Sequence, residues 1–339
     1  MTTLSATHPT MLDVMRRLDP DGSIDTNVVE LLTQVAPELE DMPMIEGNLP
    51  TGHRTTVRTG LPAPTWRKLY GGVQPTKSLT AQVTDTCGML EAYAEIDKAL
   101  ADLNGNTAAF RLSEERAFVE GMGQEFASTL WYGNETTEPE AFTGFSPRYA
   151  DISAGQGNVI SGEGATAPDG AAENASIWLI GWGENTIHGI YPKGSKAGLT
   201  ITDKGQVTIG QSTDGYYEGY RTHYRWDVGL CVRDWRYAVR YAFNLEDLLA
   251  SCATGNVLHE YMVRMQEVIP SLTNCKPVYY MNRQVLSMLR QQMNTKAAYN
   301  LSFETLGGKH VSVFNGIPVR RSDALLSTEG TTLGDSPVA

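Results

Sequence analysis

The residues of this 339-residue chain that could carry chemistry are few and far apart. Its six histidines, at positions 8, 53, 188, 223, 259 and 310, include no pair at the four-residue spacing that places two metal ligands on one helix face. Its four cysteines, Cys87, Cys231, Cys252 and Cys275, form no CxxC motif and lack zinc-ligand spacing. We therefore expect reduced, buried thiols, no metal site, no cofactor and no catalytic residues.

Two glycine-rich segments match nucleotide-binding loops only in part. Residues 162–167 fit the GxGxxA spacing of a dinucleotide loop, but Pro168, Asp169 and Gly170 follow where a helix must begin to hold a pyrophosphate at its N-terminus. Residues 307–310 (Gly-Gly-Lys-His) lack the first glycine and the Ser or Thr of a P-loop. Neither segment predicts a nucleotide site, so the sequence favours a protein that is not an enzyme.

Five arginines lie between Arg221 and Arg240, within a strand-rich block that runs from 176 to 243. A basic groove for nucleic acid is one hypothesis for them. Asp227 and Asp234 are interspersed, however, and mixed charges on paired strands are more typical of a solvated or interfacial face. The chain carries 27 basic and 39 acidic residues, a formal net charge of -12, which opposes sequence-independent binding to DNA phosphates.

The charge changes sign abruptly near residue 50. Residues 1–50 hold nine acidic and two basic side chains, whereas residues 51–80 hold five basic ones and no acidic one. The five are Arg54, Arg58, Arg67, Lys68 and Lys77. Alternating Thr, Val and Arg before a Pro- and Gly-rich middle, and Gln and Thr after it, predict a two-stranded hairpin. Its tip carries Trp66, Leu69 and Tyr70.

This predicted hairpin is polar on both faces, and a two-stranded ribbon alone is not stable in water. One interpretation is that it packs on its own domain. Its aromatic tip and its positive charge favour the other interpretation, in which the hairpin lies on a second, acidic copy of the same chain.

A long amphipathic helix is predicted over 107–131, with a length of about 37 Å. Its apolar stripe repeats at multiples of four residues and consists of Phe110, Phe118, Met122, Phe126 and Leu130. A stripe of this spacing is typical of a helix face that packs on the core. Gly121 and Gly123 cost the helix about 1 kcal/mol each relative to alanine, which indicates close packing or curvature there.

The rest of the chain mixes helix and strand. Residues 150–175 are rich in Gly, Ala and Ser and predict a surface loop. Further on, the pattern predicts helices over 257–269 and 283–296 with a short strand at 277–281 between them. Asn315-Gly316 supplies the positive φ angles of a type I′ turn and predicts a hairpin over 310–321.

This order of parts resembles the major capsid proteins of tailed double-stranded DNA phages with the Hong Kong 97-type fold. Tyr132-Gly133-Asn134 with Phe142-Thr143-Gly144-Phe145 resembles the exit from the spine helix of that family. Residues 314–319 (Phe-Asn-Gly-Ile-Pro-Val) with 322–325 (Ser-Asp-Ala-Leu) resemble its Gly-Ile-Pro-Val hairpin. Nearly the whole chain, above all residues 47–78 and 182–199, is similar to the coat proteins of short-tailed phages of the epsilon-fifteen kind.

The resemblance implies an α+β, Hong Kong 97-like capsid fold with an N-terminal arm, an extended loop (E-loop), a peripheral domain (P-domain) and an axial domain (A-domain). The implied division is an arm at 1–47, the E-loop hairpin at 48–92, the P-domain at 93–145 with its spine helix at 107–131, a strand-rich P/A region at 146–245, A-domain helices with the Asn-Gly hairpin at 246–326, and a C-terminal tail at 327–339. Asn315, Gly316 and Pro318 then belong to the A-domain hairpin. The intersubunit E-loop contacts are assigned to Arg54, Arg58, Trp66, Arg67, Lys68, Leu69, Tyr70 and Lys77.

The resemblance further implies a coat protein of the virion that self-assembles into pentamers and hexamers of an icosahedral shell, enclosing double-stranded DNA without specific binding. The implied partners are copies of itself, a separate scaffolding protein, a portal and a decoration protein, with assembly in the host bacterial cytoplasm and no membrane. An encapsulin-like compartment shell is the alternative, and a cytosolic enzyme that uses the arginine-rich strands is a third hypothesis. Some relatives join a hairpin lysine to an asparagine, but for Lys68 and Lys77 we expect ordinary lysines and no crosslink.

Overall fold

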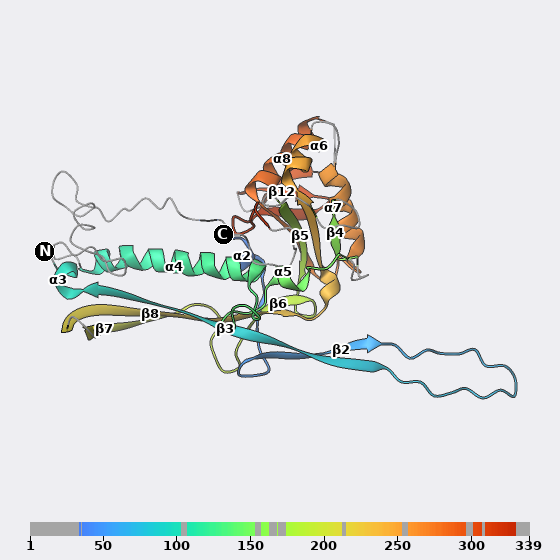
Figure 1. The fold of residues 1–339 in the computed structure, drawn as a ribbon, viewed down its shortest axis with the longest axis horizontal. Helices are drawn as coiled ribbons and strands as arrows, with labels where there is room; N and C mark the ends of the chain where they lie inside the picture. The colour runs from blue at the N-terminus through green and yellow to red at the C-terminus, as the bar shows by residue number, and fades with distance from the viewer. Residues whose placement is uncertain are drawn as a thin grey trace.

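The computed structural model describes residues 34, 36–102, 107–152, 157–162, 168, 174–211, 215–252, 257–295, 301–306 and 309–329. Figure 1 shows three parts: a long ribbon of strands beside one long helix, a lobe in which shorter helices cover a sheet, and a hairpin that projects away from both. The predicted arm and tail lie mostly outside the described residues, as do residues 163–167 and 307–308 of the two glycine-rich segments.

The described strands form a thirteen-stranded sheet in the order β11-β12-β13-β10-β5-β6-β8-β3-β2, with β1 beside β6, β7 beside β8, and β9 between β4 and β5. The strands are β1 (Met44–Glu46), β2 (Gly52–Gly60), β3 (Leu79–Asp97), β4 (Val159–Ser161), β5 (Asn174–Trp182), β6 (Ile187–Tyr191), β7 (Thr200–Gln211), β8 (Gly215–Val232), β9 (Ala238–Asn244), β10 (Lys276–Met281), β11 (Leu301–Leu306), β12 (Lys309–Phe314) and β13 (Ile317–Arg321). The helices are α2 (Glu38–Asp41), α3 (Lys98–Ala101), α4 (Thr107–Tyr132), α5 (Phe145–Arg148), α6 (Leu245–Cys252), α7 (Val257–Val268), α8 (Arg283–Thr295) and the 3-10 helix η1 (Trp235–Tyr237).

Strands β3 and β8 form the long ribbon. Their antiparallel register runs from the pair Cys87 and Gly229 to the pair Asp97 and Gly219, and β7 extends the ribbon by pairing with β8. Strand β3 passes without a break from the projecting hairpin into this ribbon, so the predicted boundary at residue 92 falls inside one strand. One continuous backbone therefore joins the hairpin to the body.

Helix α4 lies along the ribbon (Figure 1) and ends one residue beyond its predicted end. Its predicted stripe faces β3 and β8. Phe110 packs with Ile96, and Met122 packs with Tyr224. The buried members of the stripe are Phe110, Met122, Phe126 and Leu130, while Phe118 is half-buried.

A cluster of aromatic side chains joins the end of α4 to the lobe. The ring of Trp131 lies 5.4 Å from Phe145 of α5, and 5.6 Å from both Trp178 of β5 and Tyr280 of β10, measured between centroids. Trp182 Nε1 donates a hydrogen bond to Tyr280 Oη at 2.8 Å. These five side chains are buried. Strand β5, which pairs with β10 on one edge and with β9 on the other, is buried along its whole length.

A buried ion pair adjoins this cluster. Arg240 Nη2 lies 2.9 Å from Glu329 Oε2, and the two side chains are 1% and 5% exposed. Glu329 also accepts hydrogen bonds from Tyr132 Oη, at 2.8 Å, and from Ser176 Oγ. The Arg240 guanidinium lies over the Trp178 ring at 5.1 Å. Both charges therefore have the partners that burial requires.

The Asn-Gly hairpin joins β12 to β13. Asn315 and Gly316 have φ angles of 49° and 80°, the positive values of a type I′ turn. Phe314 pairs with Ile317 across the turn, and Pro318 lies opposite Val313. Strand β13 then pairs in parallel with β10, which places this hairpin inside the sheet of the lobe.

Three local predictions are wrong. The segment 150–175 is not a loop throughout, because β4 pairs in parallel with β9 and β5 begins at Asn174. The thiols of Cys87 and Cys275 are half-buried rather than buried. The close packing predicted at Gly121 and Gly123 does not occur within the described chain, since a Cβ at either position would meet no atom within 4 Å.

Candidate assembly surface

The projecting hairpin, residues 52–86, is named the basic hairpin below. Its strands pair from Gly52 and Thr86 at the root to Gly60 and Leu79 at the outer end, and residues 61–78 form its tip. The nine residues of β2 span about 30 Å at about 3.3 Å per residue. At the root the strands approach so closely that a Cβ at Gly52 would lie 2.0 Å from the carbonyl oxygen of Asp85, so only glycine fits there.

The tip of the basic hairpin contacts almost nothing on its own chain. Trp66 is 105% exposed, Tyr70 is 104% exposed and Leu69 is 84% exposed. Tyr70 has a φ of 62°, in the left-handed region that is uncommon for residues other than glycine. The interpretation that the tip packs on its own domain is therefore wrong, and large apolar side chains in this state mark a surface that another molecule covers.

The positive charges of the basic hairpin have no acidic partners among the described residues. Arg58, Arg67, Lys68 and Lys77 form no ion pair within that part of the chain. Arg54 Nε donates a long hydrogen bond of 3.3 Å to Thr84 Oγ1. The hairpin therefore presents unneutralised positive charge to its surroundings.

The arginines between Arg221 and Arg240, unlike the basic residues of the hairpin, are mostly paired with acidic side chains. Four of their five arginines lie against carboxylates, with shortest distances between 2.6 and 3.0 Å. The pairs are Arg221 with Glu95, Arg225 with Asp227, Arg236 with Asp234, and Arg240 with Glu329. Mutual neutralisation leaves these strands without the basic groove that nucleic acid would need.

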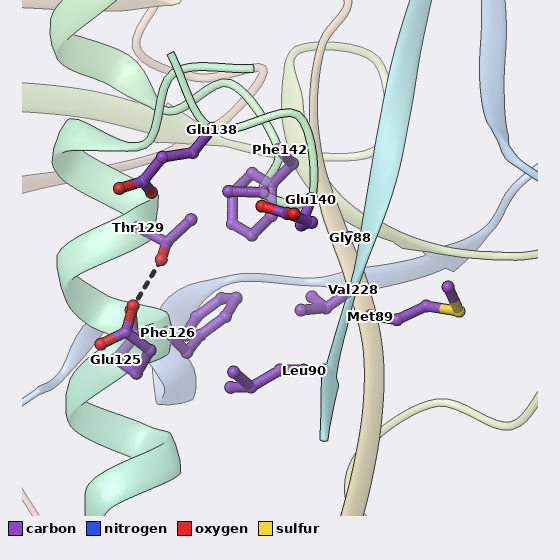
Figure 2. Close-up of a pocket in the computed structure, with 11 residues that line it drawn as sticks. Gly88, Met89, Leu90, Glu125, Phe126, Thr129, Glu138, Glu140, Phe142 and Val228 are labelled. Carbon is purple, nitrogen blue, oxygen red and sulfur yellow. Dashed lines mark hydrogen bonds between the residues drawn. The ribbon is translucent and has the colours of Figure 1, made fainter. Parts of the chain in front are cut away.

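A groove lies between β3 and α4. It consists of a pocket of about 190 Å³ and a shallower one of about 340 Å³, which share Leu90 and Glu125. Figure 2 shows Phe126 of α4 and Phe142 of the following loop between the helix and strand β3. We name it the acidic groove and define it by Leu90, Glu125, Phe126, Glu138, Glu140 and Phe142.

The rim of the acidic groove is negative and its floor is apolar. Glu125, Glu138 and Glu140 are exposed and form no ion pair within the described chain. Thr129 Oγ1 is occupied by a hydrogen bond of 2.9 Å to the backbone oxygen of Glu125, drawn in Figure 2. Gly121, with open space around it, lines the shallower pocket.

The described thiols are chemically quiet. Burial raises the pKa of Cys87 and Cys275 to about 11 and that of Cys231 to about 12, and nearby carboxylates add to the rise at Cys87 and Cys231. A nucleophilic cysteine requires the opposite shift, because the thiolate is the reactive form. The described chain thus offers surfaces for association rather than an activated thiol.

The sequence model of the family described as "Major capsid protein GP7" matches residues 19–332. The chain belongs to this family of major capsid proteins. It is also similar to a solved structure of bacteriophage Epsilon15, with 33% sequence identity, a TM-score of 0.76, and coverage of 98% of this chain and 100% of the other. The predicted α+β, Hong Kong 97-like capsid fold and the predicted function as a phage major capsid protein are confirmed.

Other structural matches are more distant. The capsid of bacteriophage JBD30 matches with 9% identity and a TM-score of 0.49, over 89% of this chain and 95% of the other. The SrpI encapsulin complex of Synechococcus elongatus PCC 7942 matches with 9% identity and a TM-score of 0.38, over 63% and 91%. Neither match carries an argument at such values, and no curated protein matches the chain.

As a major capsid protein, the chain is a structural component of the phage virion and assembles with copies of itself into the capsid shell. Its family is not an enzyme family. Among the described helices, none combines the length and the hydrophobicity needed to cross a membrane.

From the sequence we expect the basic hairpin to lie on the acidic arm or spine helix of a neighbour, but the groove beside that helix is not predicted. The residues of the acidic groove come from β3, from α4 and from the loop after α4, and each is unremarkable in its own segment. Two features mark the groove: open space around Gly121 and glutamates without ion pairs among the described residues. Both become visible only once the fold is known.

Proposed function

We propose that this major capsid protein forms the pentamers and hexamers of an icosahedral shell by inserting the basic hairpin of each subunit into the acidic groove of a neighbour. The observation that carries the proposal is the tip of the hairpin, with two aromatic side chains fully exposed and three basic ones, Arg67, Lys68 and Lys77, unpaired within the described chain. In the assembled shell, Arg54, Arg58, Trp66, Arg67, Lys68, Leu69, Tyr70 and Lys77 make the contacts between subunits.

Charge and size both support this pairing. The residues of the hairpin between 51 and 80 carry five positive charges, and the rim of the groove carries three glutamates. A dry cavity of about 150 Å³ accepts benzene, so a pocket of about 190 Å³ admits the ring of Trp66 or Tyr70. Opposite charges orient the two surfaces, while burial of the aromatic ring supplies most of the affinity.

The separate placement of the basic hairpin and the acidic groove on one subunit favours closed rings of subunits. Figure 1 shows the basic hairpin directed away from α4, so the donor and acceptor surfaces of one chain are separate. A contact between two different surfaces is heterologous, and such contacts close into rings when the rotation between subunits permits. Many modest contacts of this kind then add up to a stable shell.

The remaining assignments belong to the same proposal. We divide the chain into the arm, E-loop, P-domain, strand-rich region, A-domain and tail at the boundaries given above, with β3 shared between E-loop and P-domain. Assembly in the host bacterial cytoplasm would use a separate scaffolding protein, a portal and a decoration protein. The net charge of -12 supports a shell that encloses double-stranded DNA without binding it specifically. Lys68 and Lys77 form no crosslink.

A charge-swap experiment tests the proposed contact. One variant replaces Glu125, Glu138 and Glu140 with lysine, a second replaces Arg67 and Lys68 with glutamate, and a third combines both sets. We expect each single set to prevent shell formation under conditions in which the wild type assembles, and the combined set to restore it. Size-exclusion chromatography and electron microscopy provide the measurement.

A charge-matched control reverses Glu246, Glu260 and Glu267, which are exposed on α6 and α7 of the lobe. This control replaces three glutamates, as the groove variant does, and so changes the net charge by the same amount. The combined variant changes the net charge less than either, because its two sets of substitutions have opposite signs. Failure of the combined variant to regain assembly, with all variants folded by circular dichroism, would refute the proposed pairing.

A further inference from the structure

The root of the basic hairpin holds a cluster of side chains that the assembly contact does not use. His53 of β2, His188 of β6 and Cys231 of β8 each offer one ligand atom, and these three atoms all lie within 4.8 Å of one another. His188 is 1% exposed and Cys231 is fully buried, while His53 is half-buried. The sequence predicts no metal site, since these residues are widely separated along the chain.

The register of the strands explains why they meet. His188 lies directly opposite Cys231 in the antiparallel pair of β6 and β8. His53 lies directly opposite Asp85 in the antiparallel pair of β2 and β3. Residues that face each other in this way have side chains on the same face of the sheet. A contact of 3.8 Å between Thr55 Oγ1 and Cys231 Sγ brings the two strand pairs together.

The polar atoms of the cluster are poorly satisfied. The Nδ1 atoms of His53 and His188 and the Oδ2 atom of Asp85 are buried without a hydrogen-bond partner in the described chain. Asp85 is 3% exposed, and its Oδ1 atom lies 2.8 Å from Arg148 Nη1. A buried unpaired polar atom costs about 1–3 kcal/mol. Two of these atoms belong to the histidines whose ligand atoms lie within 4.8 Å of the Cys231 thiol, which indicates a missing common partner.

We propose that His53, His188 and Cys231 bind a zinc ion at the root of the basic hairpin. Two imidazoles and a thiolate are a donor set that suits zinc, whereas magnesium and calcium require oxygen ligands. Bond lengths of about 2.0–2.3 Å place tetrahedral ligand atoms roughly 3.5 Å apart, so the side chains must close by about 1 Å.

Binding replaces the thiol proton of Cys231 with the zinc–sulfur bond, and the proton leaves to solvent. The ion would tie β2 and β3 of the hairpin to β6 and β8 of the body. It would thereby fix the direction in which the basic hairpin leaves the subunit.

Metal analysis of the full-length protein tests this site. The chain is produced in bacteria supplied with zinc chloride, purified without chelators and analysed by mass spectrometry for metals. We expect about one zinc per chain, a loss of about tenfold or more in bound zinc in the variant Cys231→Ser, and wild-type zinc content in the control Cys87→Ser. Cobalt replacement should give a thiolate-to-cobalt absorption band that Cys231→Ser removes and Cys87→Ser retains.

His53→Gln is the second variant, because His53 is half-buried and its replacement disturbs the fold less if Cys231→Ser fails to fold. Loss of zinc in His53→Gln and retention in Cys87→Ser would support the site. Zinc absent from a folded wild-type chain, also after refolding with zinc chloride, would overturn it. Zinc retained equally by Cys231→Ser and His53→Gln would overturn it as well, because the metal would then be bound elsewhere.

Discussion

Replacement of Trp66 with alanine probes the assembly contact at its centre. In the isolated subunit Trp66 is 105% exposed, so the substitution removes no contact within the chain. We expect its effect on the free energy of unfolding of the subunit to be within about 0.5 kcal/mol. In the proposed contact the same side chain becomes buried in the acidic groove of a neighbour, so we expect its loss to weaken each contact between neighbours.

The magnitude follows from the area involved. A tryptophan side chain buries about 150–250 Å², which at about 25 cal/mol per Å² sets an upper limit of about 4–6 kcal/mol. Truncation of an aromatic side chain at the centre of an interface costs about 2–4 kcal/mol. Because 1.4 kcal/mol corresponds to a tenfold change in affinity, even 2 kcal/mol raises the concentration needed for assembly about 30-fold.

A concentration series followed by sedimentation measures this threshold, and thermal unfolding of unassembled subunits measures intrinsic stability. Thr65→Ala is the matched control, since it trims a neighbouring exposed side chain of the same tip. An unchanged assembly threshold for Trp66→Ala would refute the role of Trp66 in the contact. A markedly lower melting temperature of the free subunit would refute the claim that the tip contacts nothing on its own chain.

Three further predictions concern the fold. Glu329→Gln leaves the buried Arg240 without its counter-ion and should lower the free energy of unfolding by about 3–5 kcal/mol in urea titrations, whereas Arg236→Gln at an exposed pair should cost about 1 kcal/mol or less. Gly316→Ala forces alanine into a φ of 80° and should cost about 1–2 kcal/mol, and Gly194→Ala, at a φ of 85°, should cost a similar amount. Burial lowers the pKa of His259 below its ordinary value of 6.5. As pH falls below 6.5, the unfolded chain therefore binds a proton at this residue more readily than the folded chain, and the free energy of unfolding declines. His259→Phe should lose less of this free energy than the wild type between neutral pH and about pH 5. Equal losses in the two proteins would contradict the assignment to His259.

The parts of the fold that the sequence predicted well are those set by local signals. The apolar stripe of α4 repeats within one element, and the turn at Asn315-Gly316 depends on two residues with positive φ angles. The basic hairpin is marked by a change of charge and by alternation within its own strands. In each case the physical cause lies inside a short stretch of chain.

The parts that the sequence did not predict depend on contacts between distant segments. Strand β4 is a strand because β9 offers hydrogen bonds to it, and the three residues Val159–Ser161 are too few to stand out from the Gly- and Ala-rich segment around them. The acidic groove and the cluster of His53, His188 and Cys231 exist only because the fold brings β3 to α4 and β2 to β6 and β8. Dispersed histidines therefore say little about metal binding until strand register is known.

A high-resolution cryo-electron microscopy map of the assembled particle tests the central claim most directly. We expect density for the basic hairpin on an adjacent subunit, with Trp66 or Tyr70 seated in the pocket beside Phe126 and Phe142 of that neighbour. A hairpin folded back onto its own ribbon, with the acidic groove covered by no part of another copy, would contradict it.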